Sequence, residues 1–224
     1  MTAQETAKSV YVFDAYGTLF DVHAAVRKHS EAIGPDAPHL SAIWRQKQLE
    51  YSWVHGLMGQ YVDFWTLTEN ALDFAFASFP SVDQGVRPAL LAAYQELDCY
   101  SEVPDVLRQL RSLGAKTAIL SNGSPDMLAS AVSSAGLGDL LNDVISVEKL
   151  RTFKTNPDVY ALVTDLYGVE PSEVSFQSSN RWDIAGAVSF GFQSVWINRT
   201  GAPDEYQRFA PTAVLNSLSD LPAL

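Results

Sequence analysis

Short apolar runs alternate with amphipathic stretches along most of the chain. The first run covers residues 10–13 and is rich in β-forming side chains, and similar runs follow at 116–120, 144–147, 174–176 and 194–197. Bounded apolar runs of this length predict buried strands. Between them lie helical patterns that each end at a glycine, which readily adopts the positive φ of a helix stop. This alternation predicts an α/β fold with a doubly wound parallel sheet.

The segment 21–100 does not follow this alternation. It shows helical spacing over 22–33, 40–58, 62–79 and 86–96, is rich in aromatic residues and contains no convincing strand. The simplest interpretation is a helical cap subdomain of residues 21–100, inserted after the first strand. Residues 1–20 and 101–224 then form the α/β core domain.

Polar side chains follow the predicted strands at the points where the strands end. Asp14 comes directly after the first strand, Ser121 and Asn122 after the second, Lys154 after the third and the segment 178–183 after the fourth. Because ligands bind outside the carboxyl ends of strands in an open α/β sheet, we expect these groups to meet at one edge. Strand-end serine, asparagine and aspartate also cap helices, which leaves a structural role open for some of them.

This set of side chains can support covalent catalysis. Asp14, held rigid by a buried strand, is placed to act as a nucleophile and form an ester intermediate. A nearby Lys154 ammonium favours the ionised carboxylate. Gly17 permits a sharp turn, and the Thr18 hydroxyl can orient Asp14. The second acid, Asp183, can activate the water that opens the ester, or can cap the helix that it begins.

Composition and charge narrow the classes of function. The chain has 224 residues, of which 47% are hydrophobic and 18% charged, as in a globular protein. Its formal net charge of −11 argues against nucleic acid and anionic membranes as partners. The only cysteine is Cys99, the N-terminal stretch is polar, and no apolar run is long enough to span a bilayer. We therefore expect a soluble cytoplasmic protein.

Three separated segments resemble one known family. These are FDAYGTLFDV at 13–22, WRQKQLEY at 44–51 and SSNRWD at 178–183, and together they are similar to the L-2-haloacid dehalogenases of the haloacid dehalogenase superfamily. The similarity extends over about residues 11–197. It implies a Rossmann-like core and hydrolysis of short L-2-haloalkanoic acids to 2-hydroxy acids and halide through an aspartyl ester. It also implies that no metal or other cofactor is needed, and a homodimer, which members of the family often form.

The resemblance also implies a role for each matching residue. The catalytic set consists of Asp14, Thr18, Lys154, Ser178, Asn180 and Asp183. The set that binds the halide or the substrate carboxylate consists of Arg45, Ser121, Asn122, Tyr160 and Trp182. In this set Arg45, Asn122 and Trp182 match the halide cradle, and Tyr160 is expected near the substrate. Ordinary core packing remains an alternative for Trp182 and Tyr160.

Two positions depart from the phosphatases of the same superfamily. Those enzymes carry a second aspartate two residues after the nucleophile, where this chain has Tyr16, and a magnesium-binding aspartate where it has Ser179. Mg²⁺ and phosphoryl transfer depend on such carboxylates, whereas halide leaves without a proton. Dehalogenation is therefore the leading hypothesis. A phosphatase-like hydrolase with an altered metal site, or a non-catalytic binding scaffold, is the alternative.

Overall fold

One six-stranded sheet forms the centre of the molecule in the computed structural model, which describes residues 9–224. Expectations about the first eight residues, the polar N-terminal stretch and the start of the core domain, lie outside the described residues. The strands all pair in parallel, in the order β3-β2-β1-β4-β5-β6. Their bounds are β1 (Val10–Phe13), β2 (Lys116–Ser121), β3 (Asp143–Ser146), β4 (Val174–Ser178), β5 (Gln193–Ile197) and β6 (Ala213–Leu215). The predicted doubly wound parallel sheet is confirmed.

The sixth strand was not predicted from the sequence. β6 has three residues, lies at the edge of the sheet and pairs only with β5. Its central residue, Val214, is 52% exposed. An edge strand this short lacks the buried apolar run by which the other strands can be detected.

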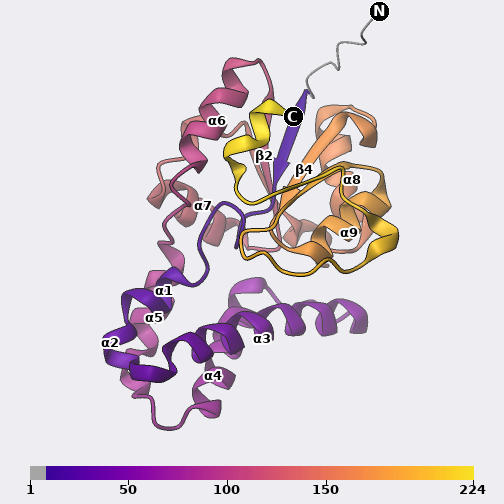
Figure 1. Cartoon of the computed structure of the whole chain (residues 1–224). Coiled ribbons are helices and arrows are strands. Elements are labelled where there is room, and N and C mark those ends of the chain that lie inside the picture. The colour runs from indigo at the N-terminus through magenta and orange to yellow at the C-terminus, as the bar shows by residue number, and fades with distance from the viewer. Residues whose placement is uncertain (1–8) are drawn as a thin grey trace, which may run out of the picture.

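Helices cover both faces of the sheet. In Figure 1, α6 (Val103–Ser112) and α7 (Pro125–Ser134) lie to the left of the sheet, and α8 (Pro157–Tyr167) and α9 (Arg181–Phe190) lie to the right. The chain runs from β1 outward to β2 and β3 and then returns to β4 on the other side of β1. The reversal puts the topological switch point, where open α/β sheets bind ligands, between β1 and β4.

A second group of helices lies beyond the carboxyl ends of the strands, below the sheet in Figure 1. It consists of α1 (Ala24–Lys28), α2 (Ser30–Ile33), α3 (Ala37–Met58), α4 (Phe64–Ser78) and α5 (Arg87–Gln95). The predicted helix over 22–33 is two short helices, and the other three predicted helices are present with slightly different ends. As predicted, the segment contains no strand. No helix in residues 9–224 combines the length and apolar character needed to cross a membrane.

Short 3₁₀ segments connect several of these elements. They are Gly34–Asp36, Gln84–Val86, Gly138–Leu140, Val147–Leu150, Pro171–Glu173, Gln207–Phe209 and Leu218–Ala223.

Local sequence explains where the long cap helices begin. Pro38 and Pro88 lie in the first turns of α3 and α5, where a missing backbone N–H costs nothing. Asp63 caps α4 by accepting a hydrogen bond from the backbone N–H of Thr66 at 2.9 Å.

We propose that residues 21–100 act as one cap subdomain on a core of 1–20 and 101–224, because the helices of this segment pack mainly on one another.

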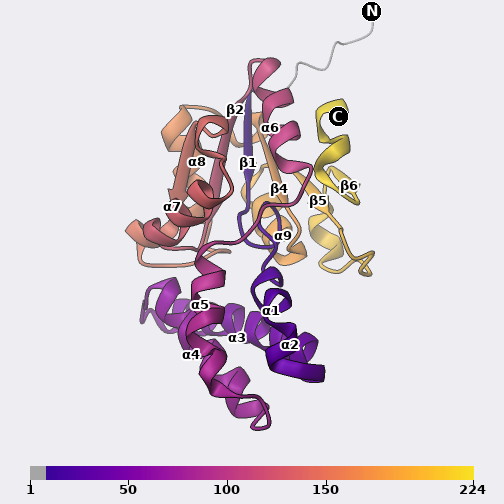
Figure 2. The same cartoon turned by 90° about the vertical axis from the view of Figure 1, so that its left-hand side faces the viewer.

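Two adjacent connections join the helical segment to the sheet, and Figure 2 shows them crossing close together. Phe20 and Cys99 form an isolated antiparallel bridge, and the backbone N–H of Tyr100 donates to the carbonyl of Leu19 at 2.9 Å. Arg199, beyond the end of β5, holds both connections. Its Nη2 donates to the carbonyl of Thr18 at 2.9 Å, its Nη1 pairs with Glu102 at 2.6 Å, and its guanidinium lies 3.7 Å from the Tyr100 ring centroid.

Candidate active site

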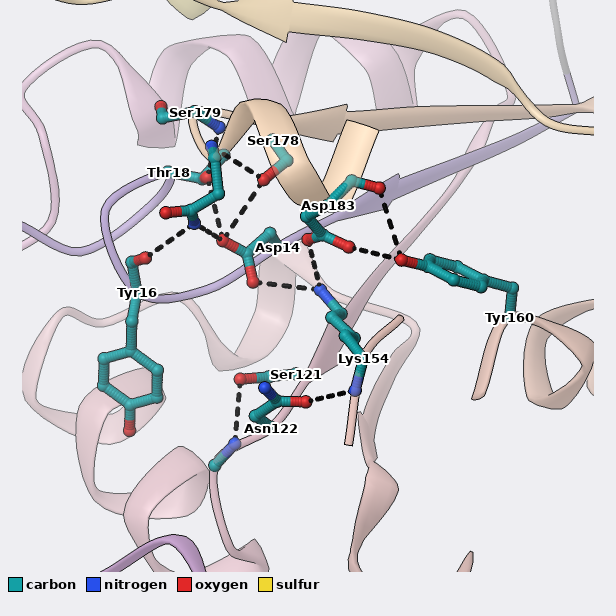
Figure 3. A network of polar contacts seen from close by, with 12 residues as sticks. Asp14, Tyr16, Thr18, Ser121, Asn122, Lys154, Tyr160, Ser178, Ser179 and Asp183 are labelled. Atoms are coloured by element: carbon teal, nitrogen blue, oxygen red, sulfur yellow. Dashed lines mark hydrogen bonds and ion pairs between the residues drawn. The ribbon is translucent and has the colours of Figure 1, made fainter. Parts of the chain in front are cut away.

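Asp14 lies at the carboxyl end of the central strand β1 and is 6% exposed. Its Oδ2 accepts hydrogen bonds from Asn180 Nδ2 at 2.8 Å, Thr18 Oγ1 at 3.2 Å and Ser178 Oγ at 3.4 Å (Figure 3). Thr18 reaches Asp14 because the chain turns back at Gly17, whose φ of 94° disfavours other residues. The carboxylate is therefore fixed in position by neutral donors from β4, the loop after it and the β1 loop.

Lys154 lies between the two acidic side chains predicted for the site. Its Nζ is 3.0 Å from Asp14 Oδ1 and 2.7 Å from Asp183 Oδ2, and the side chain is 1% exposed (Figure 3). Burial alone would lower the pKa of Lys154, but the two carboxylates outweigh it and the pKa is raised. The ammonium therefore stays charged and leaves a net charge of −1 on the trio when both acids are ionised.

Asp183 lies in the first turn of α9 and is completely buried. Its carboxylate accepts hydrogen bonds from Lys154 Nζ and from the Tyr160 hydroxyl, the latter at 2.8 Å, so it does not act as a helix cap. Burial raises the pKa of Asp183 to about 6; Lys154 opposes this rise and the charge on Asp14 adds to it. A carboxyl group with such a pKa can accept a proton near neutral pH.

Tyr160 packs in the core beside Asp183, in line with the core-packing alternative left open by the sequence. It is fully buried, its ring packs against Phe176, Phe190 and Phe192, and Figure 3 shows it on the far side of Asp183 from Asp14. The pKa of Tyr160 is raised well above its usual value by burial and by Asp183, so its hydroxyl remains a donor. The Tyr160 hydroxyl therefore supports the Asp183 carboxylate, and its proximity to a substrate stays a prediction.

The tight packing of Gly186 against Tyr160 leads to a first testable prediction. Gly186, in α9, has no room for a Cβ, which would meet the Tyr160 hydroxyl and lie 2.8 Å from Thr155 Cγ2. In a helix, Gly→Ala normally stabilises by about 1 kcal/mol. We expect Gly186→Ala to destabilise the fold by about 1–3 kcal/mol and lower turnover, because overpacking moves Tyr160 away from Asp183.

Urea unfolding and initial rates measure both effects. Gly138→Ala is the control, because nothing lies within 4 Å of the added Cβ there. A Gly186→Ala variant as active and as stable as the Gly138→Ala variant would contradict this account of the site.

Arg45 extends from α3 to the loop that carries Asp14. Its Nη2 donates to the carbonyl oxygen of Tyr16 at 3.0 Å, and its Nη1 donates to Gln48 Oε1 at 2.8 Å. Asn180, which holds Asp14, also lies within 3.4 Å of the Tyr16 carbonyl. The structure thus brings this residue of α3 to the loop that follows Asp14.

Ser121 is the last residue of β2 and Asn122 follows it, and β2 lies beside β1 on the side opposite to β4. Asn122 Oδ1 accepts a hydrogen bond from the backbone N–H of Lys154 at 3.0 Å, which fixes the orientation of the amide. This bond occupies the amide oxygen, so the NH₂ group of Asn122 is the part of the amide that can donate to a ligand. Ser121 Oγ accepts from the backbone N–H of Gly123 at 3.1 Å, which likewise leaves its own proton available to donate.

Trp182 lies where the cap meets the core. Its ring contacts Trp53 of α3 edge-on, with centroids 5.4 Å apart. Both tryptophans line a cavity of about 860 Å³, which Lys154 also lines, together with mainly apolar residues of α3, α9 and the loops. Trp182 therefore packs on an aromatic residue of α3 and borders this cavity, and its contact with halide stays a prediction.

A magnesium site does not fit this arrangement. Within residues 9–224, no group of three or more His, Cys, Asp or Glu side chains is placed to hold a metal ion. The two acids, Asp14 and Asp183, both face the Lys154 ammonium, and the backbone N–H of Ser179 donates to Thr18. A divalent cation would compete directly with Lys154 for the same carboxylate oxygens.

Sequence reasoning missed the cap residues that hold Arg45. Gln48 is 1% exposed and contacts Thr68 and Tyr94 in addition to Arg45. A signal was present, because Gln48 lies one helical turn after Trp44 on a face that is otherwise expected in the core. A buried glutamine needs partners, so its position marked a polar network.

Comparisons with known protein families, with curated proteins and with solved structures all point to the same family of hydrolases. Residues 8–191 match the family model described as haloacid dehalogenase-like hydrolase. The chain is 50% identical over 215 residues to (S)-2-haloacid dehalogenase 1 of a Pseudomonas species (strain CBS-3), which covers 95% of this chain and 94% of the relative. It is 47% identical to (S)-2-haloacid dehalogenase 4A of Burkholderia cepacia, over 94% of this chain and 91% of that one.

A solved structure extends the similarity to three dimensions. The L-2-haloacid dehalogenase of Xanthobacter autotrophicus with chloropropionic acid covalently bound superposes with a TM-score of 0.88 at 39% identity. The superposition covers 97% of this chain and 98% of that chain.

Proposed function

This chain belongs to the haloacid dehalogenase-like hydrolases, and from that premise we propose that it hydrolyses short L-2-haloalkanoic acids to 2-hydroxy acids and halide. The observation that carries the proposal is the Lys154 ammonium buried between the carboxylates of Asp14 and Asp183. It supplies a fixed anionic nucleophile and a second acid with a raised pKa, without a metal ion.

Asp14 performs the first half-reaction. Its Oδ2 is held by three donors, whereas Oδ1 accepts only from Lys154, so Oδ1 keeps the lone pair that attack on carbon requires. Oδ1 attacks C2 of the substrate from the side opposite the halogen. The new C–O bond forms as the carbon–halogen bond breaks, and halide leaves with the bonding electrons. The configuration at C2 is thereby inverted.

Donors from the cap and core receive the anions. Arg45, the amide NH₂ of Asn122 and the edge of Trp182 form the halide cradle. The substrate carboxylate is held by the Ser121 hydroxyl, Asn122 and nearby backbone N–H groups. Support comes from the placement of Arg45 at the nucleophile loop and from the Asn122 orientation set by Lys154.

Asp183 performs the second half-reaction, with Tyr160 as its support. It removes a proton from water, and the resulting hydroxide attacks the carboxyl carbon of the Asp14 ester. The ester C–O bond breaks and the 2-hydroxy acid leaves with the proton from Asp183. The second proton of water remains on the Asp14 carboxyl group and is released to solvent, which regenerates the Asp14 carboxylate. The oxygen of the product hydroxyl therefore comes from Asp14, and the oxygen of water enters Asp14.

A phosphatase-like reaction is not favoured. Tyr16 occupies the position of the phosphatase acid–base aspartate, and the pKa of its phenol is raised well above its usual value, chiefly by burial. It cannot protonate a leaving ester oxygen as a carboxylic acid does. The retained trio of Asp14, Lys154 and Asp183 likewise speaks against a non-catalytic scaffold.

Halide release from the two enantiomers of 2-chloropropionate tests the proposal directly. We expect the L-enantiomer to release chloride at the same rate with and without excess EDTA, and the D-enantiomer to release little. A single turnover in H₂¹⁸O should place the heavy oxygen in Asp14, detected by mass spectrometry of the peptide that contains it. Magnesium-dependent release of phosphate from an ester, with no halide release, would overturn the proposal.

The raised pKa of Asp183 sets the pH dependence. Below pH 6 Asp183 becomes neutral and cannot act as a base, and Lys154 then pairs only with Asp14. We expect kcat to fall roughly tenfold between pH 7 and pH 5, because ester hydrolysis then limits turnover and follows one ionising group with a pKa near 6. Steady-state halide release at saturating substrate across this range measures kcat, with circular dichroism to verify folding at each pH. A flat profile would show that Asp183 is not the base.

We also propose that the enzyme is cytoplasmic and forms a homodimer. A cytoplasmic location is supported by the lone Cys99, since proteins of oxidising compartments more often carry disulfides. A homodimer is supported by exposed apolar side chains at the end of α3, among them Leu57 and Met58. Light scattering at several protein concentrations measures the assembly.

A further inference from the structure

Arg45 is held by a neutral amide. Gln48 lies in α3 one helical turn after Arg45, and its Oε1 accepts the hydrogen bond from Arg45 Nη1 at 2.8 Å. The opposite nitrogen of the guanidinium donates to the carbonyl of Tyr16 at 3.0 Å. One oxygen of the cap and one of the core thus fix the plane of the guanidinium. Both acceptors are uncharged.

Thr68 of α4 determines which way the Gln48 amide faces. The Thr68 hydroxyl donates its single proton to the carbonyl of Phe64 at 2.7 Å, so its oxygen can only accept from Gln48. Gln48 Nε2 therefore points at Thr68, at 2.7 Å, and Oε1 necessarily points at Arg45. The Tyr94 hydroxyl lies 3.0 Å from Nε2 and 3.2 Å from Oε1.

Burial gives this arrangement its electrostatic importance. Gln48 is 1% exposed, Thr68 is fully buried and Tyr94 is 3% exposed, so the partners that hold Arg45 on this side lie out of contact with solvent. A carboxylate in place of Gln48 would orient the guanidinium equally well. It would also neutralise the positive charge, which a departing anion needs in a site of low dielectric.

We propose that Gln48 is a positioning residue for dehalogenation, which orients the Arg45 guanidinium toward the departing halide while leaving its full charge available. The inference rests on the proposed function, in which Arg45 receives the halide. It adds to that function a chain of partners, from Thr68 through Gln48 to Arg45, that links the packing of α3 on α4 to the carbon–halogen bond.

Two substitutions separate orientation from charge. Gln48→Glu keeps the shape and an acceptor but neutralises Arg45, and we expect the single-turnover rate with L-2-chloropropionate to fall roughly 100-fold. Gln48→Met keeps the volume and removes the acceptor, with an expected loss of roughly tenfold from misorientation. Gln109→Glu, the same change at an exposed position of α6, should leave the rate unchanged.

The leaving-group dependence distinguishes positioning from a structural role. Bromide leaves with less help than chloride, so weaker stabilisation of the halide should raise the ratio of rates for L-2-bromo- and L-2-chloropropionate. We expect this ratio to increase at least severalfold in Gln48→Glu, and inhibition by added chloride to weaken. General damage to the fold would lower both rates equally.

The results also separate this inference from the proposed function. A wild-type enzyme that releases no halide from either substrate overturns the proposed function and removes the premise. An active wild-type enzyme whose bromide-to-chloride ratio and chloride inhibition are unchanged in both Gln48 variants overturns the role of Gln48 alone. Should Gln48→Glu fail to fold, the Gln48→Met variant decides through the same two readouts.

Discussion

Replacing Asp14 with asparagine should abolish halide release. The amide is nearly the same shape but has no anionic oxygen to attack C2, and its NH₂ group must face either the Lys154 ammonium or the donors to Oδ2. Loss of a nucleophile that forms a covalent intermediate lowers kcat by roughly 10⁴-fold or more. Chloride release from L-2-chloropropionate, followed with a chloride electrode over several hours, gives the measurement.

The control for this variant is Asp165→Asn. Asp165 is exposed on α8, so the same chemical change there should leave the rate at the wild-type value. Circular dichroism should show that Asp14→Asn remains folded, because Lys154 keeps Asp183 as a partner. Turnover near the wild-type rate in folded Asp14→Asn would exclude the covalent route.

Lys154→Met should cost both stability and activity. The substitution leaves Asp14 and Asp183 buried and facing each other without the cation that separates them. Removing one partner of a buried ion pair costs roughly 3–5 kcal/mol of unfolding free energy. Activity should fall by roughly 100-fold or more, since the oriented, ionised form of Asp14 is lost. Urea unfolding and initial rates provide the two measurements.

A second substitution tests the electrostatic cause. Adding Asp183→Asn to Lys154→Met removes one of the two unpaired charges, so the double variant should recover part of the stability while remaining inactive. Lys149→Met, at an exposed position, is the matched control and should change neither quantity. A Lys154→Met protein as stable as this control would show that the two acids do not depend on Lys154.

The central strands β1, β2, β4 and β5 could be predicted because they are buried on both faces. The continuous apolar run of β1 has no polar position to confuse it with an amphipathic helix, and glycines mark the ends of the flanking helices. β6 was missed because a three-residue edge strand carries no such run. The break between α1 and α2 at His29 was missed because apolar spacing continues across it.

The candidate site could be predicted as far as strand ends determine it. Asp14, Ser121 and Ser178 end neighbouring strands, and the rule for parallel sheets brings them together. The contact of Tyr160 with Asp183 could not be predicted, because it depends on how the Tyr160 ring packs against three phenylalanine rings. The hydrogen bond from Arg45 to Gln48 could not be predicted either, because it depends on how α3 packs on α4. Both are properties of tertiary packing that sequence spacing does not determine.

Thr18 belongs to two parts of the molecule that are usually considered separately. Its hydroxyl aims Asp14, and its carbonyl is the anchor of Arg199, which also binds the returning connection through Glu102 and Tyr100. Arg199 therefore ties the two connections between the helical segment and the sheet to the same residue whose hydroxyl donates to Asp14, so any change in the angle between them would displace a hydrogen-bond donor of that carboxylate.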